Sequence, residues 1–293
     1  MLNGPMNISQ NQDSRNSTGV HQDTSRRVIR ADALSQDALI DLWEGLKRYD
    51  FWSSFALHEI RQRFRRSLLG PLWLTVSMGI FVGALGLIST TLFKQDVHQT
   101  LPYIATGVIF WGFLTTSLTE GAIVFITREA YIRNVPLPVS THVYQMLMRN
   151  LIIWLFNMAI YLVVILIFSI NPGPTALLFL FGGPLFLINI AWVSFATGIL
   201  STRFRDIPQV IASLLQVVFF VTPVFWTVRT MPDRPAFVRW NPIYHLLEIV
   251  RAPLLGEAPP YESWAVAIGL AVVGCSITAW LYRRAQPRIA YWV

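Results

Sequence analysis

Long apolar stretches with at most one charged side chain recur along this sequence. Residues 71–93 form the first stretch, with 23 consecutive uncharged residues. As an α-helix this stretch is about 35 Å long at roughly 1.5 Å per residue, which is enough to cross a hydrocarbon core of about 30 Å. Five further stretches have a similar character: residues 101–125, 151–170, 176–200, 210–228 and 264–282. The sequence therefore predicts an all-α polytopic membrane protein with six transmembrane helices.

The composition indicates that a bilayer is the solvent of this chain. Hydrophobic residues make up 54% of the 293 residues and charged residues only 13%, whereas soluble proteins carry about 25% charged residues. The single cysteine, Cys275, excludes an intramolecular disulfide. We expect three regions: a disordered cytoplasmic tail at 1–35, a cytoplasmic amphipathic interface helix region at 36–69, and a transmembrane domain at 70–293.

Basic residues orient the predicted helices. One side collects most of the lysines and arginines in short flanks and loops: Lys47, Arg48, Arg61, Arg63, Arg65, Arg66, Arg128, Arg133, Arg149, Arg203, Arg205, Arg283, Arg284 and Arg288. The other side has Lys94 in its first loop, none in its second, and four arginines in a long loop whose charge carries less weight. Both termini are therefore predicted to be cytoplasmic, and the net charge of +7 is attributed to these flanks, not to nucleic-acid binding.

A basic amphipathic helix is predicted ahead of the first membrane stretch. Leu57, Ile60, Phe64 and Leu68 recur at helical spacing, and Gly70-Pro71 is expected to end the helix. Four arginines flank the apolar face: Arg61, Arg63, Arg65 and Arg66. Such a helix lies along lipid headgroups. It is either a flank that sets topology or a surface strut that contacts a cytosolic partner.

The predicted membrane helices lack the groups that ion-coupled carriers and enzymes use. Glu120 is the one ionisable residue within them, and it is expected to lie at the interface close to Arg128. No G-x-x-x-x-G-K-[ST] motif occurs in the sequence, so an ATPase that drives this protein would be another chain. No metal-binding cluster, carboxylate pair or G-x-S-x-G motif is found in the apolar stretches or their short loops, and no catalytic residue is predicted.

Small and polar residues form stripes on two predicted helices. Gly79, Gly83, Gly86 and Thr90 follow helical spacing in the first, which is typical of close helix packing. In the fifth, the stripe contains polar amides that lipid would not solvate: Gln209, Ser213, Gln216 and Phe220. This face is predicted to be either a conduit wall or an interhelical hydrogen-bonding surface. Aromatic rings near its far end would suit sugar stacking or an interfacial belt: Phe219, Phe225 and Trp226.

The long outer loop at 229–263 is predicted to contain two short interfacial or re-entrant helices. Asn241 suits an N-cap and Pro242 the first helical position. The apolar face that follows is too short to cross a membrane: Ile243, Leu246, Leu247, Val250 and Leu254. The loop is interpreted either as a lid at the outer exit or as a surface cap. Its candidate gate residues are Phe237, Trp240, Asn241, Tyr244 and Arg251.

The loop at 127–138 is predicted to hold a short helix ended by prolines. It is either a charged turn or a segment that a partner subunit grips. The candidate contact residues are Arg128, Glu129, Tyr131, Arg133, Asn134, Pro136 and Pro138.

Seven motifs together resemble the ABC-2 type membrane subunits of polysaccharide exporters, which export O-antigen, capsule and teichoic-acid chains. The resemblance covers about residues 40–293 and follows the order of the motifs along the chain. They are residues 65–73 (RRSLLGPLW), 107–111 (GVIFW), 133–138 (RNVPLP), 203–207 (RFRDI), 222–226 (TPVFW), Asn241-Pro242 with Arg251, and 282–290 (YRRAQPRIA).

This resemblance implies a multi-pass protein of the bacterial inner membrane. Two copies of the chain would form a homodimeric pore, driven by two copies of a separate nucleotide-binding subunit that binds ATP and Mg, with no cofactor in this chain. The loop from Arg128 to Pro138 would carry the coupling helix, beside the arginine strut. The first and fifth spans would bound the conduit, including Gly79 and Gln216, and the segment from Phe237 to Leu254 would carry the gate helices. The implied substrate is a glycan on a polyprenyl diphosphate carrier.

Two other functions remain open at this stage. An ABC-2 exporter of a small lipid or drug would not need a conduit of glycan size. A polytopic enzyme acting on polyprenyl-linked sugars would need catalytic groups that the apolar stretches do not offer.

Overall fold

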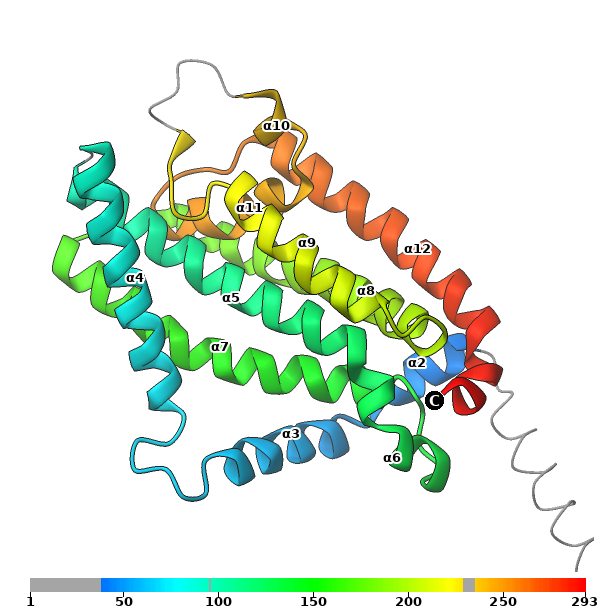
Figure 1. Ribbon diagram of the computed structural model, residues 1–293. Helices are drawn as coiled ribbons and strands as arrows, with labels where there is room; N and C mark the ends of the chain where they lie inside the picture. The colour runs from blue at the N-terminus through cyan, green and yellow to red at the C-terminus, as the bar shows by residue number, and fades with distance from the viewer. Residues whose placement is uncertain (1–37, 95, 229–234) are drawn as a thin grey trace, which may run out of the picture.

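The computed structural model describes residues 38–94, 96–228 and 235–293, and the regular structure in these ranges is helical (Figure 1). The predicted tail at 1–35 lies outside the described residues. In chain order the helices are α2 (Ala38–Lys47), α3 (Tyr49–Arg63), α4 (Leu72–Phe93), α5 (Val97–Thr127), α6 (Glu129–Asn134), α7 (Thr141–Phe168), η1 (Gly173–Leu178), α8 (Phe179–Arg203), α9 (Ile207–Val221), α10 (Ala236–Arg239), α11 (Pro242–Leu254) and α12 (Tyr261–Trp292). The prediction of an all-α fold is confirmed for this part of the chain.

Five helical segments among the described residues are long and apolar enough to cross a membrane. They are Leu72–Thr91, Val97–Thr127, Thr141–Phe168, Gly173–Arg203 and Tyr261–Ile289. Each contains or largely overlaps one of the predicted stretches, so five of the six predicted spans are confirmed as candidate spans. The chain is therefore a multi-pass membrane protein.

The fifth predicted stretch, residues 210–228, does not form one long helix. Helix α9 ends at Val221, and its 15 residues are about 22 Å long, which is shorter than a hydrocarbon core of about 30 Å. Thr222 has an extended backbone because the following residue, Pro223, disfavours the helical conformation before it. The prediction of a helix through Val228 is therefore wrong, and residues 222–228 turn back into the bundle.

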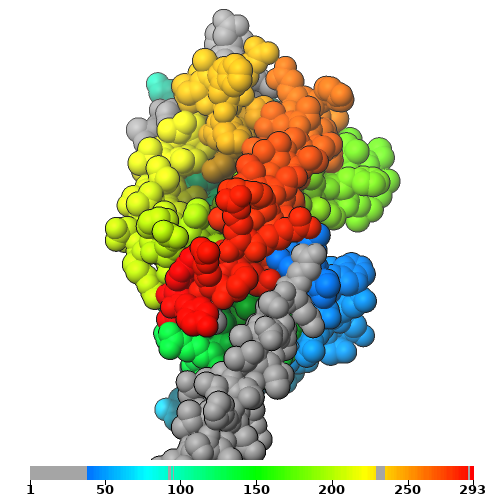
Figure 2. All heavy atoms as spheres, turned by 90° about the vertical axis from the view of Figure 1, so that its right-hand side faces the viewer, coloured from blue at the N-terminus to red at the C-terminus, as the bar shows by residue number. Residues whose placement is uncertain are grey.

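Helix α5 is the central element of the bundle. In the most apolar 18-residue part of α5, 61% of the residues are buried within the chain. The corresponding share is 17–22% in the other four candidate spans. Asp96 starts the helix by accepting a hydrogen bond from the His98 backbone N–H at 3.0 Å. Helices α4, α7, α8, α9 and α11 all contact α5, whereas α12 covers α8 and α11 on the outside. Figure 2 shows α12, in orange and red, running across one face of the molecule.

Glycines bring α5 close to α8. A Cβ atom at Gly121 would lie 2.8 Å from Cα of Ser194, and one at Gly198 would lie 2.8 Å from the carbonyl oxygen of Gly121. Ser194 also donates a hydrogen bond to the Ser117 carbonyl at 3.0 Å. Small residues permit such close helix contacts within membranes, where van der Waals packing drives association.

The two ends of the bundle differ in their covering elements. Helices α2 and α3 lie at the end where α6 lies, which we call the α6 end, and α10 lies at the opposite α10 end (Figure 1). The predicted basic helix exists but begins and ends earlier than expected, since α3 spans Tyr49–Arg63. Arg65 and Arg66 therefore lie in the turn after α3, and Gly70 does not end the helix but occupies a turn with φ of 57° before α4.

The long outer loop contains two short helices, α10 and α11, as predicted. Asn241 caps α11 by accepting hydrogen bonds from Ile243 and Tyr244 backbone N–H groups, and Pro242 follows it in the first helical position. Helix α11 is buried along almost its whole length, against α5, α8 and α12. It is therefore a core helix of the α10 end and not a surface cap.

Candidate functional site

An open groove of about 590 Å³ runs between α4, α5 and α9. Among the described residues that line it, none carries a charge. The lining combines aromatic rings, aliphatic groups, two threonines and one glutamine: Met78, Phe81, Val108, Trp111, Gly112, Thr115, Thr119, Ala212, Leu215, Gln216, Phe219 and Phe220. This groove brings together side chains that can offer hydroxyl, amide and ring-face contacts.

The polar stripe predicted on the fifth span lies on the exposed face of α9. Gln209, Ser213, Gln216 and Phe220 are all exposed in the single chain. Only Gln216 and Phe220 of these four line the groove, together with Phe219. Neither the Gln209 nor the Gln216 amide has a hydrogen-bond partner among the described residues.

The glycines of the stripe on α4 differ in how closely neighbouring helices pack against them. A Cβ atom at Gly79 would lie 3.9 Å from Ile160, and one at Gly86 would lie 3.1 Å from Leu101, so both ends pack against neighbouring helices. Gly83 has open space beside it. Thr90 donates its hydroxyl hydrogen to the Gly86 carbonyl at 2.9 Å. Gly79, Gly83 and Thr90 do not line the groove.

Helix α5 supplies groove residues that the sequence reasoning missed. Trp111, Thr115 and Thr119 are spaced four residues apart and therefore share one helix face. Trp111 contacts the Phe219 ring across the groove, with 5.5 Å between ring centroids. The same helical-spacing argument that was applied to α9 would have found this stripe on α5.

Aromatic rings gather where α9 ends. The Phe219 and Phe225 rings are stacked with centroids 5.3 Å apart, and Phe220 meets Phe225 edge-on at 6.0 Å. Trp226 donates its indole N–H to the Phe220 carbonyl at 3.2 Å and contacts the Phe237 ring at 6.2 Å. The predicted aromatic residues of α9, the turn and α10 thus form one continuous cluster.

The five candidate gate residues separate into two groups. Phe237 and Trp240 are exposed, with Trp240 at 84% exposure, whereas Asn241, Tyr244 and Arg251 are buried. The Arg251 guanidinium lies 3.7 Å from the centroid of the Tyr103 ring, donates to the Pro223 carbonyl at 2.8 Å, and pairs with Glu248. Arg251 therefore joins α11, α5 and the turn after α9.

The loop at 127–138 contains the predicted short helix, α6, which ends before Val135 and Pro136. Tyr131, Arg133, Asn134 and Pro136 are exposed, while Glu129 and Pro138 are half-buried. Arg133 pairs with Glu129 one turn away. Arg128 points inward to Glu59 of α3 and does not belong to the exposed surface of the loop.

The arginines predicted at the interface lie on the surface of the α6 end. Arg61 and Arg63 occupy the last turn of α3, and Arg65 and Arg66 follow it, all of them exposed. Among the described residues no group of three His, Cys, Asp or Glu side chains could hold a metal ion.

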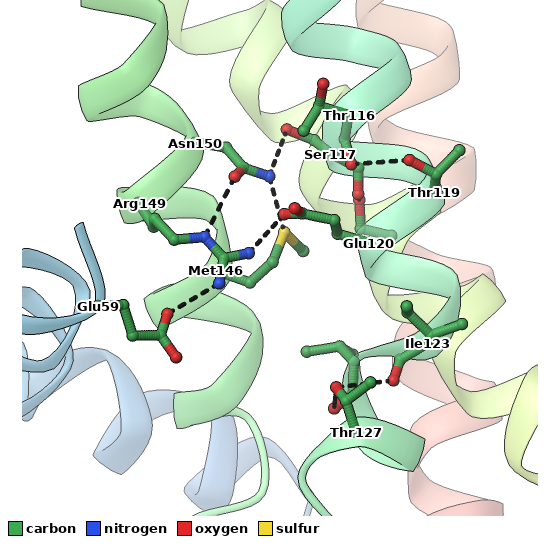
Figure 3. A network of polar contacts seen from close by, with 12 residues as sticks. Glu59, Thr116, Ser117, Thr119, Glu120, Ile123, Thr127, Met146, Arg149 and Asn150 are labelled. Atoms are coloured by element: carbon green, nitrogen blue, oxygen red, sulfur yellow. Dashed lines mark hydrogen bonds and ion pairs between the residues drawn. The ribbon is translucent and has the colours of Figure 1, made fainter. Parts of the chain in front are cut away.

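An ion-pair network lies inside the α6 end (Figure 3). Glu120 of α5 pairs with Arg149 of α7, and Arg149 donates to Glu59 of α3 at 2.8 Å. Glu120 and Arg128 do not pair with each other, because Arg128 pairs with Glu59, but both belong to this network through Arg149 and Glu59. Burial on its own raises the pKa of Glu59, but hydrogen bonds and charges from Arg128 and Arg149 outweigh it and lower that pKa below its usual 4.5.

Three curated proteins resemble this chain. The O-antigen export system permease protein RfbA of Myxococcus xanthus is 24% identical over 205 residues, which cover 68% of this chain and 78% of that protein. A protein of the same name from Klebsiella pneumoniae is 22% identical over 228 residues, covering 75% of this chain and 87% of the relative. Another Klebsiella pneumoniae protein of that name is 20% identical over 211 residues, which cover 70% of this chain and 80% of that protein.

A family model described as the ABC-2 type transporter matches residues 52–255. This range runs from α3 to the end of α11 and contains the groove, the ion-pair network and α6. The match covers more than half of the chain and agrees with the multi-pass helical fold. The chain belongs to the ABC-2 type transporter family of membrane proteins.

Proposed function

We propose that this chain is the permease subunit of an ATP-driven transporter that exports a polysaccharide linked to polyprenyl diphosphate across the bacterial inner membrane. The observation that carries the proposal is the uncharged groove between α4, α5 and α9, lined by aromatic rings, threonine hydroxyls and the Gln216 amide. The names of the three relatives, which are O-antigen export permeases, support this class of substrate.

A conduit for a polymer must bind each segment weakly and many times. Hydroxyls and amides exchange hydrogen bonds with sugar hydroxyls, and ring faces stack on sugar rings, so a chain can move from one contact to the next. A fixed charge in the same place would hold or repel segments strongly because the surroundings have a low dielectric constant. The uncharged lining of the groove suits this requirement.

The exposed face of α9 supports a homodimer around this groove. Gln209, Ser213 and Gln216 face outward from the single chain, and polar groups exposed to lipid are unfavourable. We propose that two copies place these faces toward each other and toward the glycan. We propose α9 as the sixth crossing in this arrangement, with residues 222–228 folded back at its α10 end and both termini in the cytoplasm.

ATP hydrolysis would come from a separate subunit. The chain carries no phosphate-binding loop of the Walker type, and its family is that of ABC-2 transporters. We propose that two copies of an ABC ATPase, which bind ATP and Mg, seat against the exposed side chains of α6. The exposed Arg61, Arg63, Arg65 and Arg66, at the end of α3 and in the turn after it, would attract the diphosphate of the carrier, since arginine forms paired hydrogen bonds with phosphate oxygens.

The opposite end would open outward. Phe237 and Trp240 are the exposed members of the candidate gate residues and continue the aromatic cluster at the end of α9. We propose that they form the exit surface, while the buried Asn241, Tyr244 and Arg251 hold its framework.

Complementation of a deletion strain tests this function. Deletion should abolish the surface glycan, and the wild-type chain should restore it. Gln216→Leu should lower glycan export by up to about tenfold, because one hydrogen bond contributes roughly 0.5 to 1.5 kcal/mol. Val217→Leu is the matched control, since Val217 is exposed on the same helix but does not line the groove. Unchanged surface glycan in the deletion strain would contradict the proposal.

Equal export by the Gln216→Leu and Val217→Leu variants would test the substrate class and not the transporter function itself. It would contradict the glycan conduit and favour export of a small lipid or drug, which does not require a long polar track. Turnover of a polyprenyl-linked sugar by the purified chain without ATP would instead indicate an enzyme.

A further inference from the structure

Helix α6 is short and exposed, and it has few contacts of its own. It has six residues and no buried side chain. An isolated helix of this length is unstable in water because nucleation costs more than so few hydrogen bonds return. Its position therefore depends on its side-chain contacts with neighbouring helices, such as Ile132 on the core, and on the segments that hold its two ends.

The N-terminal end of α6 is held by α3. Arg128, which directly precedes α6, pairs with Glu59 of α3, and Glu59 also accepts a hydrogen bond from Arg149 of α7 at 2.8 Å. Both side chains of the Arg128–Glu59 pair are 18% exposed, so solvent screens the pair only partly. Phe55 of α3 adds an edge-on ring contact to Tyr131 of α6, with centroids 5.8 Å apart.

The C-terminal end of the α6 loop is held by α2. The buried Asp41 carboxylate accepts hydrogen bonds from the backbone N–H groups of Val139 at 3.0 Å and Ser140 at 3.1 Å. The Ser140 hydroxyl returns a hydrogen bond to the Asp41 carbonyl at 2.8 Å. Hydrogen bonds to an ionised carboxylate are stronger than those between neutral groups.

Two features extend this second attachment. The Tyr282 hydroxyl of α12 donates to the same Asp41 carboxylate at 2.6 Å, and the Tyr144 hydroxyl of α7 donates to the Leu42 carbonyl at 3.1 Å. Gly45 of α2 faces Ser140 so closely that a Cβ atom there would collide with the serine side chain. Asp41 thus ties α2, the start of α7 and α12 at one buried point.

We infer that α2 and α3 form a clamp that fixes both ends of the α6 segment, with Glu59 and Asp41 as its two positioning residues. The clamp rests on the proposed function in one respect, namely that an ATPase subunit docks on α6. A movement of α6 is then passed to α3, α7 and α12 through charged hydrogen bonds, and not through the flexible loop alone. The residues act on transport through α6 and touch neither nucleotide nor glycan.

Hydrogen exchange of the full-length protein tests the clamp directly. Glu59→Gln and Asp41→Asn should each speed amide exchange in residues 129–140 about tenfold, because each removes a charge-assisted hydrogen bond from one end. Glu120→Gln is the matched control for Glu59→Gln. It breaks the ion pair between Arg149 and Glu120 and leaves the Arg128–Glu59 pair intact. Tyr282→Phe is the matched control for Asp41, since it leaves the Val139 and Ser140 contacts in place. Exchange that stays at the wild-type rate in both test variants would overturn the clamp.

Reconstitution with the partner ATPase gives the second readout. Both test variants should lower the amount of glycan exported per ATP hydrolysed, with an unchanged KM for ATP. Glu120→Gln should keep the wild-type ratio, whereas Tyr282→Phe, which removes the link from Asp41 to α12, should lower that ratio without speeding exchange in residues 129–140. Faster exchange with an unchanged ratio would overturn the transmission role. The exchange measurement needs neither ATPase nor glycan, so it judges the clamp even if the proposed function fails. Should one variant not fold, the other tests the opposite end alone.

Discussion

Helices α5 and α9 line the same groove but differ in almost every other respect. Helix α5 is buried along most of its length, and its threonine hydroxyls bond to carbonyls within the same helix, as Thr115 does to Trp111 at 2.9 Å. Helix α9 has one buried residue, Leu215, and presents unpaired glutamine amides. The polar groups of α5 are therefore satisfied within the fold, whereas the glutamine amides of α9 have no partner among the described residues.

The difference indicates that α5 has a structural role and that α9 presents an exposed surface. Contacts of α5 with α4, α6, α7, α8, α9 and α11 determine the shape of the bundle, so changes in α5 should act on stability. Contacts of α9 are fewer, so changes there should affect stability less, and under the proposed function they should act on glycan export.

The largest effect is expected at Arg251, which connects α5 to the end of α9. Arg251→Ala should lower the free energy of unfolding by about 3 to 5 kcal/mol, because it leaves the Glu248 carboxylate and the Pro223 carbonyl without their partner. Thermal unfolding of the purified protein measures the loss. Arg239→Ala is the control, since its pair with Glu262 is exposed and should contribute under about 1 kcal/mol. Equal stability of the two variants would show that the buried arginine does not hold the α10 end.

A smaller loss is expected where α5 crosses α8. Gly121→Val should destabilise the protein by about 1 to 3 kcal/mol, because the added atoms collide with the Ser194 backbone. Gly269→Val on α12 is the matched control, since nothing lies within 4 Å of its would-be Cβ atom. Urea or thermal denaturation compares the two variants. A tolerated Gly121→Val would mean that close packing of α5 does not set the bundle.

The smallest effect is the pH dependence of stability that Glu59 of α3 adds through its pairs at the α6 end. The folded-state pKa of Glu59 lies below its unfolded value of 4.5, so its contribution to stability is complete above pH 4.5. That contribution is lost as pH falls through the lowered pKa, when Glu59 takes up a proton and releases Arg128 and Arg149. The melting temperature of the wild type should therefore drop about 2 °C more than that of Glu59→Gln between pH 6 and pH 3. Identical pH profiles would show that the network adds no pH-dependent stability.

Much of the fold follows from the sequence because apolar length is a local property. Five predicted stretches correspond to candidate spans, and the N-cap role of Asn241 was readable from residue type and the following proline. The end of α9 was misjudged because hydropathy continues through residues 222–228, while Pro223 stops the helix. The burial of α11 was also missed, since an apolar face does not reveal how many neighbours surround it.

The candidate site was predictable only in part. The stripe with Gln216 was visible in the sequence. Trp111 and Thr115, which line the same groove, lie on a helix about 100 residues earlier in the chain. Asp41 could not be predicted, because its partners are backbone N–H groups 98 and 99 positions further along the chain. Such contacts depend on the tertiary fold and leave no local pattern.

The proposed function places the α9 side of the groove in contact with the exported glycan. A photo-reactive amino acid introduced in place of Gln216, in the reconstituted permease with its ATPase, tests this most directly. The control places the same group at Val273, which is exposed on α12 away from the groove. The account predicts that ATP-dependent export yields cross-links between lipid-linked glycan and position 216, and none at position 273. Glycan cross-links at position 273 without any at position 216 would contradict it.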